Sequence, residues 1–141
     1  MVNKINKKKI NYEPIYKEEF MNPKQVKYFK NLLQTWKNDL LQESSNTLDH
    51  LKEESSNKPD NADRASIESE RSLELRTRDR ERKLISKIDA ALRRIDLKTY
   101  GYCEETGEPI GLGRLKARPI ASLSVDAQER HEKMEKIHKD E

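Results

Sequence analysis

The sequence contains a single cysteine, and that scarcity restricts its chemistry. With only Cys103 among 141 residues, no internal disulfide can form and no cysteine-only metal site can be complete. Hydrophobic residues make up 33% and aromatic residues 6% of the chain, so any core must be small. No apolar run approaches the roughly 20 residues of a membrane span, and no apolar segment follows the N-terminal lysines as in a signal peptide. We therefore expect a soluble, cytoplasmic protein without membrane contact.

Glycine is also scarce, and all four glycines lie between positions 101 and 113. This distribution argues against a turn-rich β fold and favours long helices that bury one narrow stripe. Charged residues reach 39%, but the formal net charge is only +3, which is too small to indicate nucleic-acid binding. The charges are unevenly distributed. Residues 49–70 carry seven acids against three bases, whereas residues 71–98 carry ten bases against five acids.

A helix-start signal precedes the first periodic segment. Asn22 suits an N-cap, Pro23 suits the first helical position, and Gln25 completes a capping box. Apolar residues then follow at alternating steps of three and four, as in a coiled-coil seam: Val26, Phe29, Leu33, Trp36 and Leu40. The helix should end near Asn57, because Pro59 disfavours helical geometry at the residue before it.

A second long helix is expected after Pro59, since no glycine or proline follows until Gly101. Its apolar seam comprises Leu84, Ile88, Leu92 and Ile95. Two stretches of about 35 residues joined by a short turn predict an antiparallel hairpin with its tip near 58–65. Thr77, Arg78 and Glu81 interrupt the second seam, so we expect weak packing midway along the hairpin.

The predicted fold class is therefore mainly α, with a long antiparallel coiled-coil hairpin on a small globular base. We assign residues 1–21 to a partly disordered N-terminal tail and 22–98 to the hairpin. Residues 99–123 should form an irregular knuckle, similar to a zinc finger but without zinc. Ser124 can cap a C-terminal helix over 125–139, within a last segment 124–141.

The knuckle has the layout of a four-cysteine zinc ribbon with three ligands missing. The four ligand positions would be Cys103, Thr106, Ser124 and Ala127. Tetrahedral structural zinc requires four good ligands, and one thiolate cannot supply them. We predict no bound zinc, no other cofactor and a buried or half-buried Cys103. No catalytic constellation is present, so we do not expect an enzyme.

Two charged segments each allow two interpretations. Asp60 and Asp63 could simply cap the second helix and interact with its dipole, or could be presented to a metal or basic surface of a partner. The basic run at 75–83 could be a solvated face with i,i+4 ion pairs, or a phosphate-binding surface.

Several sequence strings resemble the DksA/TraR family. They are Pro-Asp-x-x-Asp-Arg-Ala at 59–65, the charged string at 72–85, Tyr-Gly-Tyr-Cys at 100–103, and the segments 110–111, 114–115 and 117–119. The resemblance spans about 21–127. It implies a non-enzymatic transcription factor that binds bacterial RNA polymerase and inserts its coiled coil into the secondary channel. Branches of this family lack zinc-site cysteines and retain the fold.

The resemblance also implies roles for individual residues. Asp60, Asp63 and Ala65 match tip residues that approach the polymerase active centre, and Arg80 matches a shaft position at the channel rim. Leu84, Lys87 and Arg118 match a site for the alarmone guanosine tetraphosphate (ppGpp), an effector of the stringent response. Gln128 stands where the family has a lysine, a loss for which Arg130 could compensate. With the alarmone, such proteins repress rRNA promoters and activate some amino-acid biosynthesis promoters.

Two other classes of function remain open on the sequence. A basic helical nucleic-acid-binding protein would bind free duplex with steep salt dependence. A coiled-coil adaptor would self-associate through a continuous apolar seam. The acidic segment around the tip and the polar middle of both helices disfavour these readings, so we expect a monomer without sequence-specific DNA binding.

Overall fold

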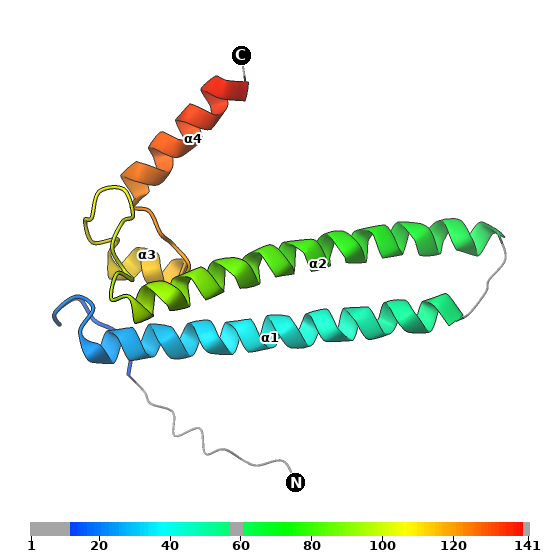
Figure 1. Ribbon diagram of the computed structural model, residues 1–141, viewed down its shortest axis with the longest axis horizontal. Helices are drawn as coiled ribbons and strands as arrows, with labels where there is room; N and C mark the ends of the chain where they lie inside the picture. The colour runs from blue at the N-terminus through cyan, green and yellow to red at the C-terminus, as the bar shows by residue number, and fades with distance from the viewer. Residues whose placement is uncertain (1–11, 57–60, 140–141) are drawn as a thin grey trace, which may run out of the picture.

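The computed structural model describes residues 12–56 and 61–139, with the side chains of 50–63 outside that description. Two long antiparallel helices dominate it, α1 (Pro23–Ser56) and α2 (Asn61–Asp96). A short helix α3 (Leu112–Ala117) and a C-terminal helix α4 (Val125–Lys139) complete the base (Figure 1). The described residues form no strand and a single isolated bridge between Tyr102 and Pro109. The predicted mainly α hairpin fold is confirmed.

The start of α1 is fixed by the predicted capping residues. The Asn22 side-chain oxygen accepts the Gln25 N–H at 3.0 Å, as an N-cap does. The Gln25 side chain returns to the Met21 N–H at 2.8 Å, one residue earlier than in a standard capping box. The Asn22 N–H is already bonded to the Glu19 carbonyl, which explains the shift. α1 ends at Ser56, next to the predicted end.

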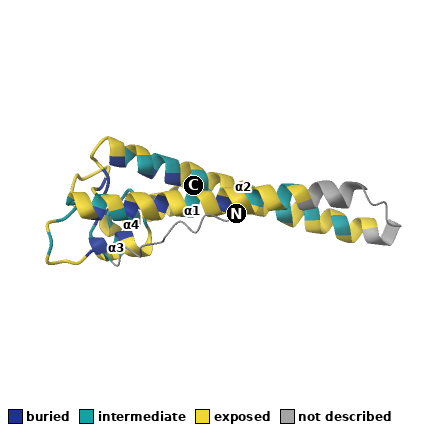
Figure 2. Ribbon diagram, turned by 90° about the horizontal axis from the view of Figure 1, so that it is seen from below, coloured by how far each residue is buried: buried dark blue, intermediate teal, exposed yellow. Residues whose placement is uncertain are grey.

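The buried core is confined to the base of the hairpin (Figure 2). Both predicted seams contribute to it, together with residues of the segment after α2: Phe29, Leu33, Leu40, Ile88, Ala91, Ile95, Tyr100, Cys103, Ile110, Leu112, Leu115, Ala121 and Ala127. Among residues 41–49 and 64–87, whose side chains are described, none is buried. The predicted weak packing of the outer shaft is therefore confirmed.

Polar contacts link the two helices where the apolar seam thins. The Ser44 hydroxyl donates a hydrogen bond to the Glu81 carboxylate at 2.7 Å. Nearer the base, the Lys37 ammonium lies 2.7 Å from the Asp89 carboxylate. Paired polar groups of this kind fix the register of a two-helix shaft at little gain in stability.

The residues before α1 wrap around the base. Pro14 is fully buried, and the Glu13 carboxylate lies 3.4 Å from the Lys116 ammonium on α3. Gly101 has φ +92°, and a Cβ there would lie 2.8 Å from Cγ of Met21. Only glycine lets the chain pass this close in that conformation.

The segment that we expected to be irregular contains the helix α3. It has six residues, with Gly111 before it and Gly113 inside it, so it carries no periodic signal. Its formation follows from tertiary packing, because Leu112 and Leu115 insert into the core. The predicted C-terminal helix over 125–139 is confirmed, and the Ser124 hydroxyl accepts the Ala127 N–H at 3.3 Å.

Candidate functional site

The start of α2, which carries the predicted tip residues Asp63 and Ala65, lies at the end of the hairpin away from α3 and α4 (Figure 1). Asp60 lies outside the described residues, so its role as a helix cap stays a prediction. Asp63 falls in the first turn of α2. Ala65 follows it by two residues and is exposed.

The basic side chains of the shaft are largely exposed. Arg80 is exposed and forms no ion pair with the described residues. Arg82 lies 3.4 Å from Asp79, but both side chains are mostly solvated, so this pair contributes little to stability. These two arginines therefore contribute little to the stability of the fold.

A pocket of about 420 Å³ lies between the base of α2 and the segment that leads into α4. It is lined by Lys87, Ala90, Arg94, Glu104, Arg114, Arg118, Ile120, Ala121, Ser122 and Gln128. Two of the three predicted alarmone residues, Lys87 and Arg118, thus come together with Gln128. Leu84 does not line the pocket and is half-buried beside the core.

The pocket is electropositive, because four cationic side chains and one carboxylate line it. One of the cations is occupied structurally. The Arg94 guanidinium lies 3.6 Å from the Glu104 carboxylate and donates to the Ile120 carbonyl at 3.4 Å. Its side chain is only 13% exposed. Arg94 and Glu104 therefore form a paired part of the pocket wall. The positive charges of the other three cations are not neutralised by a carboxylate of the pocket.

Arg94 and Arg114 line this pocket although our sequence analysis assigned them no role. Arg94 follows Lys87 by seven residues, two helical turns, and that spacing could have placed both on one face of α2. No local signal could have found Arg114, because its position depends on how the chain folds back after Tyr100.

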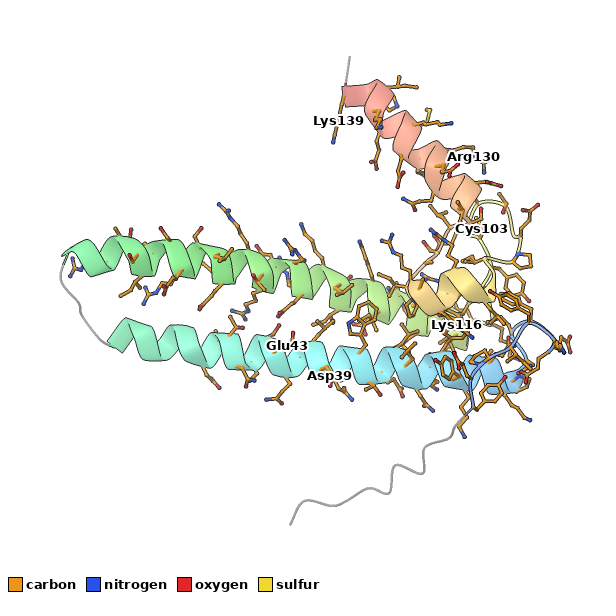
Figure 3. All side chains as sticks on the ribbon, turned by 180° about the vertical axis from the view of Figure 1, so that it is seen from behind. Asp39, Glu43, Cys103, Lys116, Arg130 and Lys139 are labelled. Atoms are coloured by element: carbon orange, nitrogen blue, oxygen red, sulfur yellow. The ribbon has the colours of Figure 1, made fainter. Side chains whose placement is uncertain are left out.

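Cys103 lies in the core of the base (Figure 3), where its residue is 3% exposed. Its backbone N–H donates to the Glu108 carbonyl at 2.8 Å, and its carbonyl accepts the Gly107 N–H at 2.9 Å. Burial raises the pKa of the thiol. Hydrogen bonds from the Thr106 side chain and from the backbone at Ser124, Thr106 and Glu105 outweigh burial and lower the pKa from 9.0 to about 6.

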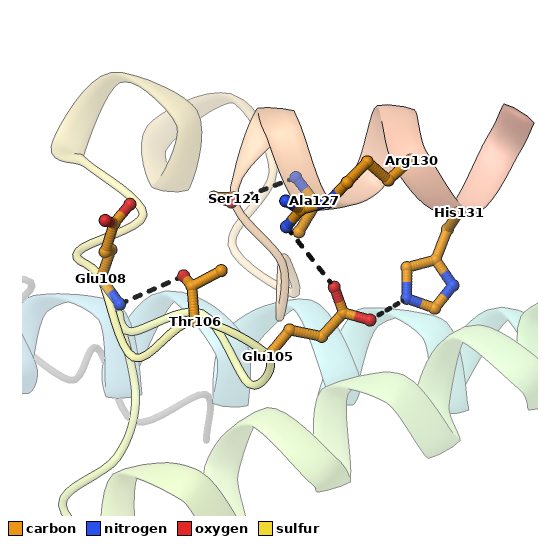
Figure 4. A network of polar contacts seen from close by, with 7 residues as sticks. All are labelled: Glu105, Thr106, Glu108, Ser124, Ala127, Arg130 and His131. Atoms are coloured by element: carbon orange, nitrogen blue, oxygen red, sulfur yellow. Dashed lines mark hydrogen bonds and ion pairs between the residues drawn. The ribbon is translucent and has the colours of Figure 1, made fainter.

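The other three positions of the zinc-ribbon layout do not supply metal ligands. The Thr106 hydroxyl accepts the Glu108 N–H at 3.3 Å, and the Ser124 hydroxyl caps α4 (Figure 4). The Ala127 side chain has no atom that could bind a metal. No group of three or more His, Cys, Asp or Glu side chains that could hold a metal exists in residues 12–49 and 64–139. One thiolate does not meet the requirement of tetrahedral zinc, so the residues present do not fit this metal.

A carboxylate links the knuckle to α4 instead. Glu105 bonds to the His131 ring nitrogen, and its second oxygen lies 3.9 Å from Arg130 (Figure 4). This exposed pair is weak and does not test whether Arg130 compensates for the lysine missing at position 128, which stays a prediction. Arg130 faces Glu105 and does not line the pocket.

Known protein families and relatives match this chain over nearly its full length. Residues 25–95 match the family of the DnaK suppressor protein DksA, N-terminal domain, and residues 98–133 match the prokaryotic dksA/traR C4-type zinc finger. A Caulobacter vibrioides protein named RNA polymerase-binding transcription factor DksA is 60% identical over 133 residues, which cover 94% of each chain. The chain belongs to the DksA family.

Other DksA relatives agree with this assignment. The Escherichia coli K12 protein of the same name is 48% identical over 111 residues, covering 79% of this chain and 74% of that protein. The solved structure of transcription factor DksA2 from Pseudomonas aeruginosa superposes with a TM-score of 0.76 at 42% identity, covering 83% of this chain and 90% of that one. The family resemblance seen in the sequence is confirmed. Within the described residues, no helix is long and apolar enough to cross a membrane.

Proposed function

We propose that this protein is a non-enzymatic transcription factor that binds bacterial RNA polymerase through its hairpin. The observation that carries the proposal is the 60% identity, over 94% of both chains, to a protein named for that activity. The shape supports it, because α2 has 36 residues and is therefore roughly 54 Å long. A slender rod anchored on a compact base is suited to entering a channel.

The proposed mechanism is insertion of the hairpin into the secondary channel of the polymerase. Asp60, Asp63 and Ala65 would approach the active centre, and Arg80 would contact the channel rim. The absence of buried residues along the described outer shaft supports this arrangement, since the shaft then presents polar and charged groups to the channel wall. The base, which contains the buried core, would stay outside the channel and hold the shaft in position.

The electropositive pocket at the base is the proposed alarmone site. Lys87 and Arg118 would bind phosphate groups of guanosine tetraphosphate, with Leu84 nearby, at the contact between polymerase and factor. Binding there would modulate promoter complexes, repressing rRNA promoters and activating some amino-acid biosynthesis promoters. We further propose that the protein acts as a cytoplasmic monomer without structural zinc, because its knuckle lacks the donor set.

Site-specific photo-crosslinking to RNA polymerase tests insertion directly. A photoreactive amino acid is placed at Ala65 on the tip or, as a matched exposed control, at Lys139 at the end of α4 (Figure 3). We expect Ala65 alone to crosslink to segments around the active centre. Absence of that crosslink from a folded protein would refute insertion.

Binding to free DNA and self-association distinguish our proposal from the two other functions. A nucleic-acid-binding protein would bind free DNA tightly, with a steep loss of affinity as salt rises. An adaptor would form stable dimers through residues 26–40. Our proposal predicts neither behaviour, and gel filtration with a DNA titration at several salt concentrations measures both.

A further inference from the structure

We propose that Arg114 is the third phosphate-binding cation of the pocket at the base, acting together with Lys87 and Arg118. This inference rests on the proposed alarmone site and names a residue that determines its affinity. It follows from a charge balance among the lining side chains, in which only some of the cations are neutralised within the fold.

The cations of the pocket differ in what they contact. Arg94 is paired with Glu104 and is nearly buried. Lys87, Arg114 and Arg118 form no ion pair with the described residues. Three positive charges therefore remain uncompensated around one cavity.

Gln128 supplies no charge where the family has a lysine. Its side-chain amide donates to the Glu132 carboxylate at 3.3 Å on the next turn of α4. Arg130 does not line the pocket, and its guanidinium lies 3.9 Å from the Glu105 carboxylate on the knuckle. Within the pocket lining, the uncompensated cation besides Lys87 and Arg118 is therefore Arg114 on α3.

Arg114 is held in a defined orientation there. Its Nε donates to the Leu123 carbonyl at 3.0 Å, and it forms no other side-chain hydrogen bond with the described residues. The terminal nitrogens are thus left for a ligand. α3 itself is rigidly placed because Leu112 and Leu115 are buried. The Arg118 N–H bonds to the Arg114 carbonyl at 2.7 Å, which sets the two arginines one turn apart.

This arrangement suits a ligand that carries several phosphate groups. A planar guanidinium with a fixed orientation can donate two parallel hydrogen bonds to phosphate oxygens and loses little freedom on binding. Lys87 on α2, Arg114 on α3 and Arg118 after α3 surround the cavity from separate segments. Such a set recognises a polyphosphate better than a single phosphate.

The test measures binding of labelled guanosine tetraphosphate to the complex of the full-length protein with RNA polymerase, with polymerase alone as background. We expect Arg114→Gln to weaken binding about tenfold or more, as loss of a charge-assisted hydrogen bond does. Arg93→Gln is the matched control, because Arg93 is exposed on α2 and does not line the pocket. That control should bind as the wild type does.

A double variant separates charge from a structural role. If Arg114 acts through its charge, the loss of affinity caused by Arg114→Gln should be smaller in a protein that already carries Gln128→Lys, because that lysine supplies a third cation to the pocket. If Arg114 only holds the Leu123 carbonyl, Arg114→Gln should weaken binding equally with Gln128 and with Gln128→Lys, and the proposal is overturned. Wild-type affinity in Arg114→Gln would overturn it as well.

Two further measurements keep the outcomes distinct. Polymerase binding without alarmone should be unchanged in every variant, and failure of the wild type to bind polymerase would overturn the proposed function and this inference together. Should Arg114→Gln fold poorly, Arg114→Lys retains the charge and tests the guanidinium alone. We expect it to bind more weakly than wild type, and unchanged binding would count against the two-bond arrangement.

Discussion

Replacing Cys103 with serine should remove a pH dependence from the stability of the base. Cys103 is 3% exposed, and the pKa of its thiol is lowered from 9.0 to about 6 despite burial. Between these two values the unfolded chain binds a proton that the folded protein has released. The thiolate therefore contributes stability that is complete above pH 9 and is lost as the pH falls through 6.

The size of the effect follows from one proton. Within this window the free energy of unfolding of the wild type, relative to Cys103→Ser, should rise by up to about 1.4 kcal/mol per pH unit. Serine is the appropriate replacement because its hydroxyl accepts similar hydrogen bonds but does not titrate. The three histidines of the chain are present in both proteins, so their titration cancels in the difference.

Urea unfolding of both proteins at several pH values, with reductant and chelator present, measures this difference. The fluorescence of Trp36, the only tryptophan, reports on the base because its half-buried side chain packs against the core. A difference in stability that stays constant between pH 6 and 9 would refute the reasoning. It would mean that the hydrogen bonds at the sulfur do not favour the thiolate.

Three substitutions and one addition extend these tests. Phe29→Ala removes a fully buried ring and should lower the free energy of unfolding by about 3–5 kcal/mol, measured by urea unfolding; a loss below 1 kcal/mol would be inconsistent with this core. Tyr100→Phe deletes the hydroxyl that donates to the Pro119 carbonyl at 2.7 Å and should cost about 1 kcal/mol in the same assay; an unchanged midpoint would argue against the bond. Ser44→Ala removes the 2.7 Å hydrogen bond to Glu81 and should accelerate amide exchange in the outer shaft without affecting the base; equal exchange would exclude a role for this contact. Adding a metal chelator should leave the thermal midpoint unchanged, and a fall would show that a structural metal is present.

The sequence alone determined the helical hairpin and the family. The cap at Asn22 and the seam steps of three and four residues are local signals, because each depends on residues within one or two helical turns. They correctly placed both long helices, and the cap at Ser124 placed the C-terminal helix. The strings at 59–65, 72–85 and 100–103 were sufficient to indicate the DksA/TraR family. The roles of Asp60, Asp63, Ala65 and Arg80 stay predictions.

Only the tertiary structure decided the chemistry of the base. The path of the chain from Tyr100 to Ser124 is fixed by contacts between distant residues, such as the Tyr100 hydroxyl on the Pro119 carbonyl and Arg94 on the Ile120 carbonyl. Such contacts have no periodicity, so neither α3 nor the pocket could be read from the sequence. Which arginines line the pocket also depends on this path of the chain. Arg114 lines the pocket, whereas Arg130 does not and lies 3.9 Å from Glu105.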